Sequence, residues 1–85
     1  MSLTILYFAW VRERIGQPEE VVSPPAEVVT VADLIGWLAK RGGGYAEAMA
    51  EPERLRAAVD QNFVGTDASI VGAREVAIFP PVTGG

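Results

Sequence analysis

The chain has 85 residues, and its formal net charge of −4 at pH 7 comes from 7 Lys and Arg residues against 11 Asp and Glu residues. This length predicts one domain spanning residues 1–85, and the acidic balance without a Lys/Arg cluster along the chain argues against a nucleic-acid-binding surface. Hydrophobic residues make up 49% of the chain and charged residues 21%, which is typical of a folded domain.

Cysteine and histidine are both absent from the sequence. Their absence excludes disulfide bonds, thiolate catalysis, Ser-His and Cys-His nucleophile pairs, and zinc sites built from those ligands. We therefore expect no metal site and no cofactor bound by this chain. The groups that remain for chemistry are carboxylates, hydroxyls, amines and the chain ends.

The first ten residues, "MSLTILYFAW", are apolar but are followed at once by Arg12, Glu13 and Arg14. The run lacks a basic leader and a small-residue cleavage site, and it is too short to cross a bilayer. We expect a cytoplasmic protein that does not associate with membranes.

The pattern of residues 3–8 predicts a strand in which Leu3, Ile5 and Tyr7 face the core. The segment "AWVRERIG" then predicts a short helical turn that ends at Gly16, because glycine readily adopts the left-handed conformation after a helix. The next segment, "EEVVS", predicts a second strand paired with the first.

The clearest helix is predicted to begin after Thr30, whose hydroxyl can cap the first turn while Asp33 completes a capping box. Its apolar stripe consists of Leu34, Ile35 and Leu38, at helical spacing. The three glycines at positions 42–44 are expected to end this helix.

A weaker helical stretch, "YAEAMAEPERL", is limited by Pro52. "LRAAVDQNFVG" predicts two short strands that meet near Asp60, and "EVAIF" predicts a last strand. Pro80 and Pro81 then stop the pairing, because proline has no amide donor. The order of elements predicts an α+β fold with one main helix on one face of a mixed sheet, which is compatible with the β-grasp architecture.

The chain finishes on "IFPPVTGG", which predicts an extended tail over residues 80–85. The two prolines stiffen its base, whereas Gly84 and Gly85 have no side chains and can pass through a narrow slot. The terminal carboxylate is unhindered, so a partner could convert it with ATP to an acyl adenylate. The chain has no P-loop of its own, because the glycines at 42–44 lack the following Lys-Ser/Thr. An ordinary frayed end is the alternative interpretation.

Three segments, "LYFAWVRERIG", "LRAAVDQNFVG" and "FPPVTGG", resemble the small subunit of molybdopterin synthase, the MoaD family of ubiquitin-like sulfur carriers. The resemblance covers nearly the whole chain in order. It implies a β-grasp fold and a noncatalytic subunit whose terminal glycine, here Gly85, is adenylated by an E1-like enzyme and converted to a thiocarboxylate. It also implies sulfur transfer to cyclic pyranopterin monophosphate within the large synthase subunit, in a heterotetramer. The sulfur donor would be a protein such as a cysteine desulfurase or a rhodanese-like protein.

The resemblance also assigns roles to individual residues. Gly85 carries the acyl group, and the residues that thread into the partner are Pro81, Val82, Thr83 and Gly84. Phe8, Phe63, Phe79 and Arg12 match positions at the partner interface. Core packing is the alternative for the three phenylalanines, and a solvated surface charge is the alternative for Arg12. The family's acidic turn before the last strand is replaced here by "VGAREVAIF", so the turn at residues 72–74 is expected to differ.

Other functions remain open at this point. A related carrier could deliver sulfur to thiamin or cysteine synthesis instead. A ubiquitin-like protein modifier would join its activated glycine to a lysine of a target protein. A plain interaction domain would carry an inert tail.

Overall fold

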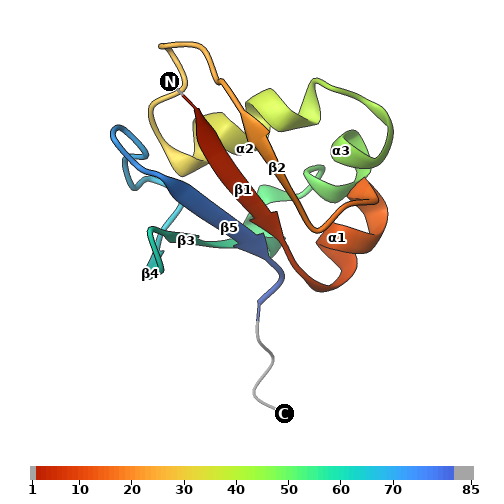
Figure 1. Cartoon of the computed structure of the whole chain (residues 1–85). Coiled ribbons are helices and arrows are strands. Elements are labelled where there is room, and N and C mark those ends of the chain that lie inside the picture. The colour runs from red at the N-terminus through yellow and green to blue at the C-terminus, as the bar shows by residue number, and fades with distance from the viewer. Residues whose placement is uncertain (1, 82–85) are drawn as a thin grey trace.

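A five-stranded mixed sheet organises the chain (Figure 1). In the computed structural model, which describes residues 2–81, the strands lie in the order β2-β1-β5-β3-β4. Their bounds are β1 Leu3–Tyr7, β2 Glu19–Val22, β3 Arg56–Val59, β4 Asn62–Val64 and β5 Glu75–Phe79. The central pair, β1 and β5, is parallel, and the other neighbouring strands are antiparallel.

The helices lie over one face and one end of this sheet. They are α1 Ala9–Ile15, α2 Val31–Ala39, α3 Gly43–Ala48 and the 3-10 helix η1 Pro52–Arg54. Figure 1 shows α2 crossing behind the sheet, with α1 and α3 side by side near the C-terminal end of β1. A β-hairpin, a crossing helix and returning strands around a parallel central pair form the β-grasp arrangement, so the predicted α+β fold class is confirmed.

The core lies between α2 and the sheet. Every second side chain of β1 points into it, because side chains alternate between the two faces of a strand. Leu3, Ile5 and Tyr7 are buried on β1, as the sequence predicted. Val76 and Ile78 on β5 are fully buried beside them. From α2, the core receives Val31, Leu34, Ile35 and Leu38. Burying each large aliphatic side chain stabilises the fold by about 1.5–3 kcal/mol, so this layer fixes the sheet under the helix.

Helix α2 begins as predicted but ends differently. The Thr30 hydroxyl accepts a hydrogen bond from the Asp33 amide at 3.1 Å, and the Asp33 carboxylate accepts one from the Thr30 amide at 3.1 Å. The prediction that the three glycines at 42–44 end this helix is wrong, because α2 already ends at Ala39, residues 40–42 connect it to α3, and Gly43 and Gly44 belong to α3. Gly42 has φ +76°, which favours glycine.

Gly44 is required for a different reason, the close approach of α3 to α1. A Cβ atom at this position would come within 1.9 Å of the Arg14 carbonyl oxygen, far inside van der Waals contact. The glycine therefore permits backbone contact between the two helices. Gly36, in the exposed middle of α2, has no such neighbour within 4 Å.

We predict opposite effects for alanine at these two glycines. Gly44→Ala should lower the free energy of unfolding by about 2 kcal/mol or more, because backbone atoms must move. Gly36→Ala should raise it by about 0.5–1 kcal/mol, because alanine restricts the unfolded chain and favours the helix. Urea denaturation of both variants measures these changes, and equal effects at the two positions would contradict the packing argument.

A polar cluster ties β1, α3 and the connection after α2 to β2. The Glu20 carboxylate accepts hydrogen bonds from the Tyr7 hydroxyl at 2.7 Å, the Tyr45 hydroxyl at 2.6 Å and the Arg41 guanidinium at 2.8 Å. The Gln17 amide donates to the Tyr45 hydroxyl at 2.8 Å. Tyr7 is almost fully buried, so Glu20 supplies the partner that its hydroxyl requires.

The charges of this cluster shift its pKa values. Burial, followed by the hydrogen bond to Glu20, raises the pKa of Tyr7 above its ordinary value. Burial alone would also raise the pKa of Glu20, but the hydrogen bonds from Tyr45, Tyr7 and Arg41 outweigh it and lower the pKa of this carboxyl. The folded protein therefore favours ionised Glu20.

We predict that Glu20→Gln destabilises the fold in a pH-dependent way. A carboxyl whose pKa is lowered on folding stabilises the protein above its ordinary pKa of 4.5, and this stabilisation is lost as the pH falls through the lowered value. The variant should lose about 2 kcal/mol at neutral pH, and the difference should shrink as the medium becomes more acidic than 4.5. Denaturation across this range tests the prediction, with the exposed neighbour in Glu19→Gln as the matched control.

None of the helices within residues 2–81 combines the length and the hydropathy needed to cross a lipid bilayer.

Candidate functional site

The candidate site begins where the chain leaves the sheet after β5. Phe79 is the last residue of β5 and pairs with Arg56 on β3. The amide of Phe8 donates to the Ile78 carbonyl at 3.3 Å and joins the end of β1 to the end of β5. Pro80 and Pro81 follow outside the strand, as predicted. The chain therefore leaves the sheet beside the start of α1 (Figure 1).

An apolar patch surrounds this exit point. It forms a shallow hollow lined by Phe8, Ala9, Ala58, Phe63, Ala77, Phe79, Pro80 and Pro81. Phe63 is 84% exposed and Phe8 is 46% exposed, whereas Phe79 is half-buried. The rings of Phe63 and Phe79 meet edge to face, with their centroids 5.8 Å apart. Such a contiguous group of exposed aromatic side chains is typical of an interaction surface.

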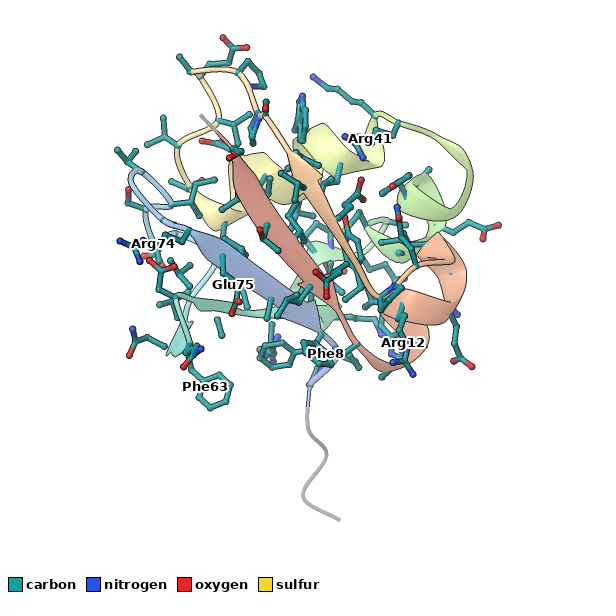
Figure 2. All side chains as sticks on the ribbon, viewed as in Figure 1. Phe8, Arg12, Arg41, Phe63, Arg74 and Glu75 are labelled. Carbon is teal, nitrogen blue, oxygen red and sulfur yellow. The ribbon has the colours of Figure 1, made fainter. Side chains whose placement is uncertain are left out.

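Strand register explains how the patch is shaped. Ala58 pairs with Ala77 on β5 and with Phe63 on β4, so two small side chains lie between larger ones on the face of the sheet opposite α2. None of the helices described within residues 2–81 covers the patch, and Figure 2 shows Phe8 and Phe63 on the side of the chain's exit. The exposure of Phe8 and Phe63 excludes core packing, which was the alternative interpretation of these two residues.

Arg12 belongs to α1, lies near the patch and is exposed to solvent. Figure 2 shows it at the same end of the sheet as Phe8. Within residues 2–81, no carboxylate oxygen lies within 4.0 Å of its guanidinium. The structure thus brings together Phe8, Phe63, Phe79, Arg12 and Pro81, five of the residues that the sequence nominated. The nominated tail residues Val82, Thr83, Gly84 and Gly85 lie outside the described residues, and their roles remain predictions.

The turn before β5 is held by Asp60, whose importance sequence reasoning missed. Its carboxylate accepts hydrogen bonds from the amides of Arg74 at 2.9 Å and Glu75 at 3.0 Å. Asp60 and Gln61 both have positive φ, +47° and +71°, in the tight turn between β3 and β4. The signal in the sequence was an Asp at a turn, a residue type that often binds nearby amides.

The described part of the site is apolar rather than polar. Within residues 2–81, no three or more His, Cys, Asp or Glu side chains gather in a way that could hold a metal ion. The patch is lined by apolar side chains, which supply neither a nucleophile nor a base. This arrangement offers an apolar contact surface next to the point at which the chain leaves β5.

Comparisons with known proteins agree with this arrangement. The family model described as the ThiS family matches residues 5–85. The molybdopterin synthase sulfur carrier subunit of Escherichia coli (strain K12) is 40% identical over 83 residues, which cover 98% of this chain and 99% of that protein. The subunit of the same name from Haemophilus influenzae is 32% identical with the same coverage. The solution structure of the Haloferax volcanii HVO 2177 protein superposes with a TM-score of 0.74 at 26% identity, covering 100% of this chain and 87% of that one.

Proposed function

This chain belongs to the ThiS family, and we propose that it is the sulfur carrier subunit of a molybdopterin synthase. The observation that carries the proposal is the apolar patch at the exit point of a chain that ends in "FPPVTGG". Two proteins that are similar over their full length bear the name of this subunit. The match to the family model extends to residue 85. A surface that docks partners and a chain end that reacts inside them account for both features.

The chemistry takes place at the carboxylate of Gly85. One of its oxygens attacks the α-phosphorus of ATP, pyrophosphate leaves, and an acyl adenylate forms. The terminal sulfur of a cysteine persulfide on the donor protein then attacks the carbonyl carbon and AMP leaves, which gives an acyl disulfide. A thiol attacks the donor's sulfur in this S–S bond and forms a disulfide with it, and the outer sulfur stays on the Gly85 carbonyl as a thiocarboxylate. Glycine suits this role because no side chain hinders the approach to its carbonyl.

The described residues serve this chemistry by directing the chain end into a partner's active site. Pro80 and Pro81 fix φ and hold the chain extended as it leaves β5, and the patch beside them gives a partner an apolar surface to bury. Residues 81–85 can then reach at most about 17 Å from the sheet into a partner's active site. The carrier is the noncatalytic subunit, and catalytic groups come from its partners.

The partners follow from this role. An E1-like enzyme binds ATP and adenylates the chain, and a cysteine desulfurase or a rhodanese-like protein supplies the sulfur. The large subunit of molybdopterin synthase receives the thiocarboxylate and transfers its sulfur to cyclic pyranopterin monophosphate, in a heterotetramer of two carriers and two large subunits. All of these proteins meet the chain at the same end of its sheet.

Intact-mass analysis of the protein, isolated from cells that make molybdenum cofactor, tests the proposal. We expect a fraction heavier by one sulfur-for-oxygen exchange, mapped by fragmentation to Gly85. This species should form molybdopterin when it is mixed with a large synthase subunit and cyclic pyranopterin monophosphate. Failure to form it would instead favour a carrier for thiamin or cysteine synthesis, and conjugates to target lysines without a thiocarboxylate would favour a protein modifier.

We predict that deletion of Gly85 abolishes molybdopterin formation and leaves the free energy of unfolding unchanged within about 0.5 kcal/mol, because the core lies within the sheet and its helices. Cofactor production in cells and urea denaturation provide the two measurements. An active deletion variant would show that the chain end is inert.

We predict that Phe63→Ser weakens binding to the large synthase subunit by tenfold or more, about 1.4 kcal/mol, because a large exposed aromatic side chain is removed from the docking surface. Val71→Ser is the matched control, since Val71 is 70% exposed and does not line the apolar patch. Calorimetric titration measures both affinities. Equal losses in the two variants would exclude a specific role for the patch.

A further inference from the structure

Two arginines from different elements stack on one indole ring. The Arg14 guanidinium carbon lies 4.6 Å from the centroid of the Trp10 ring, and that of Arg54 lies 5.8 Å from it. Trp10 and Arg14 belong to α1, whereas Arg54 ends the 3-10 helix η1. We call these three residues the cationic platform. Its two arginines are far apart in the sequence, so no charge cluster marks the platform there.

The platform is built on rigid parts of the fold. Trp10 packs against the hydrophobic core and is only partly exposed. The Arg14 backbone lies in the close contact between α1 and α3 that Gly44 permits. Pro52 opens η1, and Leu55, directly after Arg54, is buried in the core. The positions from which both arginine side chains extend are therefore fixed before any partner binds.

The charges of the platform are only partly compensated within the chain. The Arg54 guanidinium donates to the Glu51 carboxylate at 3.1 Å, but both side chains are more than half exposed, so this pair contributes little. Within residues 2–81, no carboxylate oxygen lies within 4.0 Å of the Arg14 guanidinium. Because both guanidinium groups lie against one ring, they are within about a Debye length of each other, ~10 Å at 0.1 M salt, and repel each other. An anion placed between them would relieve this repulsion.

The platform adjoins the proposed docking surface. Phe8 and Ala9, which line the apolar patch, directly precede Trp10 at the start of α1. On the other side, Arg56 follows Arg54 by two residues and pairs with Phe79 at the end of β5. A protein large enough to cover the patch and the chain's exit would therefore extend over the platform, because standard interfaces bury about 800 Å² on each partner.

We infer that the cationic platform binds an Asp or Glu side chain of the large synthase subunit, at the rim of the contact made by the apolar patch. This inference rests on the proposed function. A planar guanidinium matches the geometry of a carboxylate and binds it bidentately, and the indole ring against which each guanidinium lies shields part of that group from water. A protein carboxylate fits better than a nucleic acid phosphate, because the whole chain carries a net charge of −4 and the adjoining surface is apolar.

Binding measurements with charge-removing variants test the inference. The double variant R14Q/R54Q should bind the large synthase subunit of the same organism about tenfold more weakly than the native chain. It should also show a smaller loss of affinity between low and high salt. R74Q is the matched control, since Arg74 is exposed and lies toward the opposite end of the sheet from Arg12 (Figure 2). Unchanged affinity in the double variant, or an equal loss in R74Q, would overturn the inference.

A second experiment identifies the acidic residue directly. R14K and R54K keep the positive charge and introduce an amine, which a carbodiimide couples to a carboxylate in direct contact. Mass spectrometry of the coupled complex should show a link from position 14 or 54 to an Asp or Glu of the large subunit. R74K should give no such link, and coupling that is no greater at the platform than in R74K would contradict the inference.

Failure of the inference and failure of the proposed function give different results. If the native chain does not bind the large subunit, the proposed function is wrong and the inference falls with it. If the native chain binds, F63S weakens the complex and R14Q/R54Q does not, then only the inference is wrong. Urea denaturation of every variant confirms that the fold is intact before binding is compared.

Discussion

The parallel pairing of β1 with β5 is the constraint on which the rest of the structure depends. It aligns Tyr7 with Ile78, so the C-terminal ends of the first and last strands lie side by side at the same end of the sheet. Helix α1 therefore starts beside the point at which the chain leaves β5, and Phe8 comes to lie in one surface with Phe79. An antiparallel pairing would place the beginning of α1 at the opposite end from Pro80. The docking surface, the exit of the chain and the arginines of α1 all follow from this one alignment.

Much of the fold could be predicted from local sequence patterns, because strand faces and helix starts depend on residues that are close together in the chain. Alternation placed Leu3, Ile5 and Tyr7 in the core, and the hydroxyl and carboxyl of Thr30 and Asp33 predicted the capping box that the structure contains. The parallel pair could not be predicted in this way, since alternation does not specify which strands become neighbours. The similarity of "FPPVTGG" and two other segments to a known family supplied the β-grasp topology that periodicity alone left open.

The features that sequence reasoning missed depend on contacts between distant segments. The glycines at 42–44 look like one helix terminator, yet Gly44 is needed where α3 touches the backbone of α1. Glu20 looks like an ordinary strand residue until Tyr7 and Tyr45 donate to it. A tyrosine predicted to be buried indicates that its hydroxyl needs a hydrogen-bond acceptor, but only the fold identifies the residue that provides it. The same applies to Trp10, because only the fold places two arginines against its ring.

The position of the apolar patch also bears on the kinetics of a carrier. The hollow is shallow and lies at a single end of the sheet, so one protein that covers Phe8 and Phe63 denies them to any other. If several partners use this surface, as proposed, they must exchange by complete dissociation, and the lifetime of each complex then limits how often the chain can be loaded with sulfur again. Since differences in affinity between related complexes lie mostly in the rate of dissociation, a complex of very high affinity would dissociate slowly and would slow the whole cycle.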